Sequence, residues 1–264
     1  MEMIERLYIH VPFCANEKCG YCAFYSEKFD LDMEKLYIKK ISDEFKEKNS
    51  LCGKIKSIYI GGGTPTALSA NTIHKMFTLI KNNFGISANC EISIESNPET
   101  LTKTKIGIIA NFANRISLGI QSFDNTTRKI IGRECTDCDI RKAIRLIQKS
   151  GIKNFSCDLI NSAPGQTLKS YESDLIQAMD AGVNHISSYS LTIEEGTALA
   201  KRRIPQDESL EIKIWKMHDD ILPTHGFKRY EISNFAMKNS KCEHNLEIWF
   251  GDKYLGIGPA ASSF

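Results

Sequence analysis

The chain has 264 residues, a length sufficient for one large α/β domain or two small ones to bury a core without cross-links. Its 34 Lys and Arg residues stand against 32 Asp and Glu residues, giving a formal net charge of +2, which excludes a sequence-wide basic surface for nucleic acid or an anionic membrane. We therefore expect small-molecule chemistry or a protein partner, and no nucleic acid.

The N-terminal segment MEMIERLYIHVPF carries Glu2 and Glu5 and is interrupted by His10 and Pro12. It lacks the basic start and the unbroken apolar core of a signal peptide. No stretch of the sequence reaches the length needed to span a bilayer. We therefore expect a cytoplasmic protein with no integral membrane segment. In that reducing compartment nine cysteines, an odd number, argue for metal binding or packing and against a disulfide framework.

Apolar, β-rich segments alternate with helix-like segments along the chain. The predicted strands are 6–11, 55–60, 90–95, 114–120, 154–160 and 184–191. The predicted helices are 31–48, 69–83, 101–112, 137–150, 167–181 and 208–225. This order predicts parallel strands joined by right-handed crossovers, in an open, partial (β/α)6 barrel related to the (β/α)8 barrel. We assign the barrel to residues 1–225, and residues 226–264, where the alternation stops, to a short C-terminal extension packing on it.

Three cysteines, Cys14, Cys19 and Cys22, follow the first predicted strand in the stretch FCANEKCGYCAF. A structural zinc site normally has four protein ligands, and Cys135 with Cys138 offers a further pair. That pair starts a helix after the fourth strand, which argues against its sharing a site with the first three. Thiolates at short spacings also hold iron–sulfur clusters. Three thiolates on a four-iron cluster leave one iron open to a substrate or cofactor, and we favour this interpretation over zinc and over chance clustering.

Other polar residues fall at the ends of the predicted strands. They are the segment GGGTPT (61–66) after the second strand, Glu95 at the end of the third, Gln121 after the fourth, Asp158 within the fifth and Thr192 after the sixth. The carboxyl ends of parallel strands meet at one edge, so we expect one shared mouth. The glycine segment alone is also compatible with an ordinary turn, and it is not a dinucleotide fingerprint. A buried Asp158 needs hydrogen bonds or a ligand, and it suits a pair of ribose hydroxyls.

With these residues in view, the sequence resembles the radical S-adenosylmethionine (SAM) superfamily, in the branch that contains oxygen-independent coproporphyrinogen III dehydrogenase and the heme chaperone HemW. The blocks that carry the resemblance extend over almost the whole chain: LYIHVPFC, YCAFYS, GGGTPT, ISIESNPETLT, NRISLGIQSFD, GR, DLI, PGQT, YSLTIEEGTAL, YEISNFA, HNLEIW and YLGIGPAASSF. The resemblance implies that Cys14, Cys19 and Cys22 hold a 4Fe-4S cluster whose open iron chelates the amino and carboxylate groups of SAM.

The resemblance also implies a set of cofactor-binding residues. They are Tyr8, Tyr21, Gly62, Gly63, Thr64, Glu95, Gln121, Arg133, Asp158 and Thr192. The segment 62–64 matches the one that receives the methionine amino group, Arg133 is suited to the methionine carboxylate, and Asp158 is suited to the ribose. His10 is typical of the family and is expected to orient the cluster loop through a hydrogen bond. No side chain is assigned as catalytic, because in such proteins the cofactor carries the difficult chemistry.

The sequence departs from the family pattern at several points. The cysteines follow C-x4-C-x2-C where the family has C-x3-C-x2-C. Ile248 stands where the heme-chaperone signature HNxxYW has Tyr, and Ser262 stands where the usual GAHSF has His. Relatives of the HemW branch continue into a further C-terminal domain, whereas this sequence stops at Phe264.

Three features favour the HemW branch, and the first is the HN…W element itself. Only seven residues precede Tyr8, whereas the dehydrogenase has a substantial N-terminal extension. Ala23 and Phe24 follow the third cysteine, where the dehydrogenase has a further cysteine two residues on. The resemblance then implies a heme chaperone that binds a 4Fe-4S cluster, SAM and heme and delivers heme to a recipient protein. The alternative is a radical SAM oxidoreductase acting on a porphyrin. The sequence names neither the heme-receiving protein nor the electron donor.

The element HNLEIW contributes the last predicted site residue. His244 is the predicted heme ligand, since neutral imidazole is a common axial ligand, and Trp249 is a predicted apolar contact. The competing interpretation of His244 is a packing residue. We expect YEISNFA to pack against the barrel, HNLEIW to lie near the open mouth, and the lateral opening between the first and last strands to be more exposed than in longer relatives.

Overall fold

Six parallel strands form the centre of the fold in a computed structural model that describes residues 3–205 and 207–264. They are β1 (Ile4–Val11), β4 (Cys52–Gly62), β5 (Ile86–Ser96), β6 (Arg115–Gln121), β7 (Asn154–Asn161) and β8 (His185–Ser190). They neighbour one another in chain order, as successive right-handed crossovers require. The predicted α/β partial barrel is therefore confirmed.

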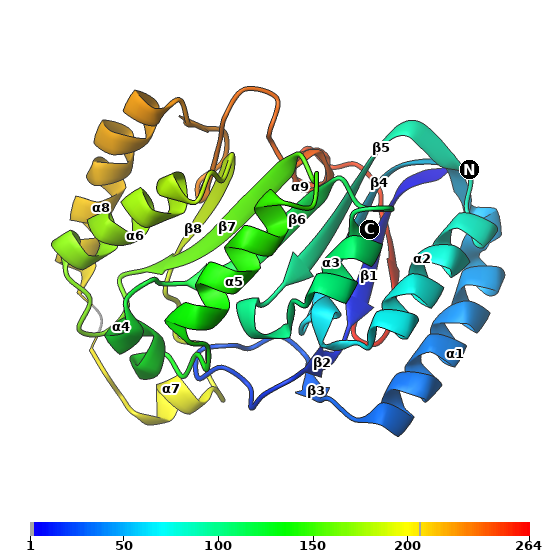
Figure 1. Cartoon of the computed structure of the whole chain (residues 1–264), viewed down its shortest axis with the longest axis horizontal. Helices are drawn as coiled ribbons and strands as arrows, with labels where there is room; N and C mark the ends of the chain where they lie inside the picture. Colours follow the sequence, from blue (N-terminus) through cyan, green and yellow to red (C-terminus); the bar gives the residue numbers. More distant parts are fainter. Residues whose placement is uncertain (1–2, 206) are drawn as a thin grey trace.

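The crossover helices lie together over one face of the sheet (Figure 1). They are α1 (Leu31–Lys48), α2 (Ala70–Asn83), α3 (Lys103–Ile109), α5 (Asp137–Gln148) and α6 (Leu168–Asp180), and α8 (Glu208–Ile221) follows the last parallel strand. Each begins after a residue whose side-chain oxygen accepts a backbone N–H of the first turn, which fixes the start of the helix. These N-caps are Asp30, Ser69, Thr102, Thr136, Thr167 and Asp207.

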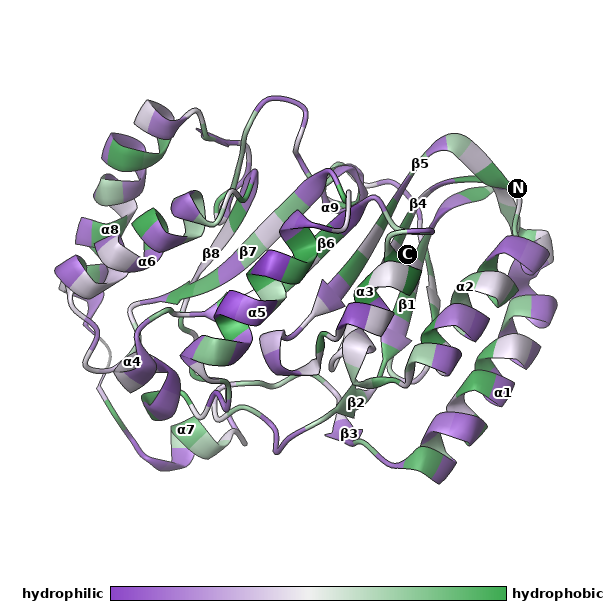
Figure 2. Ribbon diagram, in the orientation of Figure 1, coloured by the Kyte–Doolittle hydropathy of each residue, from purple (hydrophilic) through white to green (hydrophobic). Residues whose placement is uncertain are grey.

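The two faces of the sheet differ in polarity, and β6 shows this residue by residue. Ile116 and Leu118 are fully buried in the hydrophobic core under the helices, whereas Arg115 and Ser117 line a cavity on the other side. The same alternation along strands and helices can be followed in Figure 2. Fully covered parallel sheets are normally apolar on both faces, so the polar inner face marks a binding site and not a second core.

The C-terminal region from residue 226 adds strands at both edges of the sheet. β10 (Asn234–Ala236) pairs antiparallel with β8 and with β9 (Lys228–Arg229), while β11 (Leu255–Ile257) pairs parallel with β1. The predicted packing of YEISNFA against the barrel is confirmed by the first of these pairings. The strand order in the sheet is β11-β1-β4-β5-β6-β7-β8-β10-β9. Both edges of the sheet therefore come from the C-terminal region, which is continuous with the barrel.

Several short elements complete the fold. They are β2 (Phe13–Cys14) and β3 (Glu27–Lys28), which pair with each other, the helices α4 (Asn125–Ile130), α7 (Ala198–Lys201) and α9 (Glu243–Trp249), and the 3-10 turns η1 (Asn49–Leu51), η2 (Pro65–Ala67), η3 (Pro98–Thr100) and η4 (Leu222–His225). In the described part of the chain, no helix combines the length and apolar character needed to cross a membrane.

The prediction that HNLEIW lies near the open mouth is wrong. This element forms α9, which lies where the strands of the barrel begin, at the opposite end from the loop that follows β1 (Figure 1). The physical reason is a pair of buried polar side chains at the middle of β4 and β5. Glu91 of β5 accepts the backbone N–H of His244, and Ser57 of β4 hydrogen-bonds to its imidazole.

Candidate functional site

A cavity of about 540 Å³ opens among the carboxyl ends of the strands. The cavity is lined by every residue predicted for the site except Tyr8 and His244. The lining residues are Cys14, Cys19, Tyr21, Cys22, Gly62, Gly63, Thr64, Glu95, Gln121, Arg133, Asp158 and Thr192. The predicted convergence on one mouth is therefore what the fold produces, and the additional residue in the C-x4-C-x2-C spacing removes none of the three cysteines from the cavity wall.

The loop that carries the cysteines is held by backbone contacts to the end of α4 and to α7. Gly20 N donates to Ile131 O over 3.0 Å, and Leu199 N donates to Gly20 O over 2.7 Å. A Cβ atom on Gly132 would lie 2.9 Å from Gly20 N, so this approach requires a glycine. The loop is thereby fixed at its midpoint between Cys19 and Cys22.

The three thiols have the chemistry of a cluster site. Burial raises the pKa of Cys19 and of Cys22, and Arg133 opposes this shift at Cys19, with its Nη1 4.0 Å from the sulfur. Within residues 3–205 and 207–264, no three His, Cys, Asp or Glu side chains are grouped closely enough to hold one metal ion. A four-iron cluster is larger and takes each thiolate on a separate iron. Three thiols around one cavity beside a cation fit such a cluster.

The glycine segment brings the backbone against its neighbours. Gly62 has φ +116°, and a Cβ atom there would lie 2.8 Å from the ring of His10. A Cβ atom on Gly63 would lie 2.7 Å from the carbonyl oxygen of Phe13. Thr64 Oγ1 accepts a hydrogen bond of 2.9 Å from Asn97 Nδ2. Glycine is therefore required at both positions, and the segment forms a fixed edge of backbone beside the cysteine loop.

Glu95 is a half-buried carboxylate that accepts from two donors in the described structure. Tyr59 Oη donates to it over 2.8 Å and Gly62 N over 3.2 Å. Burial nevertheless raises the pKa of Glu95 to about 7, and the negative charge of Asp158 adds to this shift. A carboxyl group poised near neutral pH beside a ligand-sized cavity is typical of a binding site.

Asp158 lies on β7, and its side chain lines the same cavity as Glu95. Both of its carboxylate oxygens accept from Ser117 Oγ, at 2.9 and 3.0 Å, and Ser187 donates a further hydrogen bond. Burial raises its pKa to about 6. A carboxylate oxygen has more than one lone pair, so Asp158 retains the capacity to accept from a ligand hydroxyl.

Arg133 forms a bidentate ion pair that the sequence did not indicate. Its Nη1 and Nη2 lie 3.0 and 3.2 Å from the two carboxylate oxygens of Glu99, and Nη2 also donates to Gly119 O over 2.9 Å. Nε is the one guanidinium nitrogen for which the described structure has no partner. The predicted contact of Arg133 with a methionine carboxylate therefore stays a prediction, and both terminal nitrogens of the guanidinium already pair with Glu99.

Tyr8 lies behind the cavity wall. Its hydroxyl is 3.0 Å from His10 Nδ1, and His10 Nε2 is 3.0 Å from the carbonyl oxygen of Tyr25. The expected hydrogen bond from His10 to the cysteine loop is thereby confirmed, because Tyr25 follows Cys22 by three residues. Tyr8 contributes to the site by holding the ring of His10.

His244 lies outside the cavity lining, near its floor. Its side chain is 2% exposed, its Nδ1 is 2.8 Å from Ser57 Oγ, and its ring stacks on Tyr59 with centroids 5.5 Å apart. Burial lowers the pKa of His244 to about 3, so the imidazole is neutral. A neutral imidazole is the form that ligates iron, but this ring is enclosed by protein, and its role as a heme ligand stays a prediction.

Sequence reasoning missed the partners that orient the predicted residues: Tyr59, Ser117, Ser187 and Glu99. Two of them, Tyr59 and Ser117, alternate with apolar residues in predicted strands, as in Arg115-Ile116-Ser117-Leu118. The alternation of polar and apolar residues within predicted parallel strands could have identified these partners. It indicates that one face of the sheet is lined with polar groups.

Comparisons with known proteins agree with this site. The sequence profile of the radical SAM superfamily matches residues 8–176. The chain is 33% identical to heme chaperone HemW of Lactococcus lactis over 97% of this chain and 69% of that protein, and 36% identical to heme chaperone HemW of Haemophilus influenzae over the same shares. It is 40% identical to heme chaperone HemW of Buchnera aphidicola from Acyrthosiphon pisum, over 96% of this chain and 68% of that protein. The chain thus spans about two thirds of these relatives.

The solved structure of coproporphyrinogen III oxidase (HemN) from Escherichia coli superposes on 99% of this chain and 65% of its own, with a TM-score of 0.87 and 23% sequence identity. At that identity the likeness establishes the fold alone. The superfamily match, which includes all three cysteines, implies a 4Fe-4S cluster and SAM as cofactors. From the profile match and the identity to these relatives, the chain belongs to the radical SAM superfamily and, within it, to the HemW family.

Proposed function

We propose that this protein is a cytoplasmic, HemW-like heme chaperone that holds a 4Fe-4S cluster and SAM in the barrel cavity, binds heme and delivers it to a recipient protein. The observation that supports it most directly is the cavity itself, which is lined by the three cysteines, the glycine segment and Asp158. The second support is the similarity over 97% of the chain to proteins named heme chaperones.

Different residues of the cavity would bind the cluster and the separate parts of SAM. Cys14, Cys19 and Cys22 would hold the cluster, and the open edge of the glycine segment would take the methionine amino group on its backbone. Asp158, already fixed by Ser117, would accept from the ribose hydroxyls. A bound cluster, once reduced, would be able to supply an electron to the sulfonium of SAM, the chemistry that the alternative function would use in every turnover. The barrel orients the cofactor and excludes water from it.

Anaerobic reconstitution with iron and sulfide, followed by heme titration, tests the proposal. We expect a cluster absorption band, saturable heme uptake at one heme per chain, and negligible release of 5′-deoxyadenosine from SAM. Efficient release of 5′-deoxyadenosine coupled to conversion of a porphyrinogen would instead support the alternative, a porphyrin oxidoreductase. Absence of heme binding with an intact cluster would contradict the chaperone function while leaving the cofactor site in place.

A further inference from the structure

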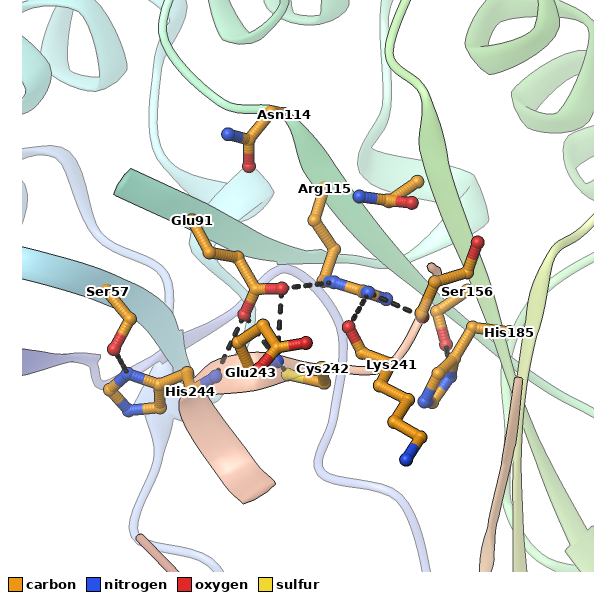
Figure 3. A network of polar contacts seen from close by, with 12 residues as sticks. Ser57, Glu91, Asn114, Arg115, Ser156, His185, Lys241, Cys242, Glu243 and His244 are labelled. Atoms are coloured by element: carbon orange, nitrogen blue, oxygen red, sulfur yellow. Dashed lines mark hydrogen bonds and ion pairs between the residues drawn. The ribbon is translucent and has the colours of Figure 1, made fainter. Parts of the chain in front are cut away.

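Residues 240–249, which we call the floor segment, close the barrel at the end where the strands begin. Cys242 and Asn245 from this segment form part of the cavity wall. The carboxylate of Glu91 accepts from the backbone N–H of Glu243 over 3.2 Å and from that of His244 over 3.0 Å, at the start of α9 (Figure 3). The floor segment is therefore both a wall of the cavity and the carrier of the predicted heme ligand.

Arg115 fastens the beginning of the floor segment. Its Nη2 donates to the carbonyl oxygens of Ser240 and Lys241, over 2.6 and 2.5 Å, and its Nε donates to Glu91 over 3.1 Å (Figure 3). Glu91 and Arg115 lie on the neighbouring strands β5 and β6, and both are buried. One buried ion pair thus supplies an acceptor and a donor to the same segment of backbone.

The floor segment contributes little to the hydrophobic core. In the described chain, none of residues 237–254 belongs to either buried hydrophobic cluster or to the partly buried residues packed against one. Trp249 at the end of α9 is 47% exposed, and the adjoining Phe250 is 77% exposed. Apolar burial is the main free energy that opposes local opening, so a segment held by polar contacts opens more readily than the strands around it.

His244 is inaccessible while the floor segment is in place. Its Nδ1 is bonded to Ser57, its ring stacks on Tyr59, and 2% of the residue is exposed. A heme iron cannot reach the imidazole in this arrangement. His244 can therefore ligate heme, as predicted, only if the floor segment moves.

We propose that the floor segment has two positions: a closed one that completes the cavity for SAM, and an open one that presents His244 to heme. This inference rests on the proposed function. Opening removes Cys242 and Asn245 from the cavity wall and admits water at the end opposite the cysteine loop, so a cofactor that needs a water-excluding cavity binds more weakly. Heme and SAM then bind preferentially to different positions of one segment, and each lowers the affinity for the other by the same factor.

Two substitutions loosen the floor segment from outside the cavity lining. Glu91→Gln weakens the contacts with the α9 backbone and with Arg115, and Ser57→Ala releases the imidazole of His244. Glu34→Gln is a matched control for the first. Glu34 is also a buried carboxylate that accepts a backbone N–H at the start of a helix, that of Ser69 before α2, but it does not contact the floor segment.

The experiment measures the dissociation constants of heme and SAM on anaerobically reconstituted protein, each with and without saturating amounts of the other. We expect SAM to weaken heme binding roughly five-fold or more, and heme to weaken SAM binding by the same factor. Glu91→Gln and Ser57→Ala should each tighten heme binding, and Glu91→Gln should also weaken SAM binding. Glu34→Gln should leave both constants within about two-fold of wild type. Independent binding of the two ligands would overturn the inference.

Hydrogen exchange on the protein without heme supplies a readout that does not depend on the proposed function. The amide hydrogens of 243–249 should exchange faster than those of β4 and β5, and Glu91→Gln should accelerate them selectively. Exchange of the floor segment only through global unfolding would overturn the inference even if heme binds. Heme binding with full affinity to a folded His244→Ala variant would also overturn it, while leaving the chaperone function standing.

Discussion

The hydroxyl of Tyr59 donates a hydrogen bond of 2.8 Å to the carboxylate of Glu95, from the strand beside it and inside the cavity. This contact favours the ionised form of Glu95, but burial outweighs it, and the pKa of Glu95 rises to about 7. An acid whose pKa is raised toward neutrality in the folded state makes the stability of the ligand-free protein depend on pH in a definite direction.

Glu95→Gln should stabilise the ligand-free protein at alkaline pH. Because the folded-state pKa lies above the unfolded value of 4.5, the wild-type side chain favours folding below pH 4.5, and this contribution is lost as the pH rises through 7. Glutamine does not titrate. The free energy of unfolding of the variant relative to wild type should therefore rise by a few kcal/mol between pH 4.5 and 7.5 and then level off. Urea unfolding at several pH values measures it, and a flat difference would contradict the shifted pKa.

Cys19→Ser should abolish cluster binding, whereas Cys135→Ser should leave it intact. Cys19 lines the cavity between the other two cysteines, while Cys135 is buried in the core and absent from the cavity lining. Iron and sulfide content with the visible absorption spectrum measures the outcome. Equal loss in both variants would indicate a four-cysteine site and would contradict an open iron.

Asp158→Ala should weaken SAM binding by about 1–3 kcal/mol, the range expected when a hydrogen bond to a charged group is removed. The fold should persist, because Ser117 and Ser187 can turn toward the cavity and its water. Asp174→Ala is the control, since Asp174 is a buried acid that accepts from Ser122 and from Phe123 N away from the cavity. It should lower stability without a specific effect on SAM. Unfolding of Asp158→Ala in the absence of ligand would show that Asp158 is structural.

Glu99→Gln should tighten SAM binding several-fold. The substitution removes the charge that Arg133 now pairs with through both terminal nitrogens and leaves the guanidinium available to a second carboxylate. Equilibrium dialysis of SAM against the reconstituted variant measures this. Weaker binding would mean that Glu99 serves to hold Arg133 in position, in which case Glu99→Asp should bind SAM better than Glu99→Gln.

The strand and helix units could be predicted because local signals agree with the tertiary packing. Ile116 and Leu118 alternate with polar neighbours on β6, and Thr136 forms a capping box with Asp139 at the start of α5. The cysteine trio and Asp158 were recognisable because each falls at or near the end of a strand in a fold whose strand ends converge. The division of the chain at residue 226 stays a prediction.

The position of α9 could not be predicted from the sequence because its partners are distant along the chain. Glu91 precedes His244 by 153 residues, and Arg115 precedes Lys241 by 126. Polar residues inside a strand indicate that polar groups of another segment face them, but they do not identify which segment of the chain it is. Glu99 was missed for a related reason: it lies in a short 3-10 turn that has no periodicity, and its role depends wholly on the guanidinium of Arg133.

The two strands that flank the barrel bear on how the chain folds as it leaves the ribosome. β10 covers the outer edge of β8, and β11 covers the outer edge of β1, yet both are encoded after residue 233. During translation the six parallel strands can assemble before either edge of the sheet is covered. The edge of β1 stays uncovered longest, because its partner Leu255–Ile257 is synthesised about 250 residues after it. Uncovered edges invite pairing with other chains. The nascent chain is therefore exposed to such pairing until β10 and β11 have emerged and covered the two edges.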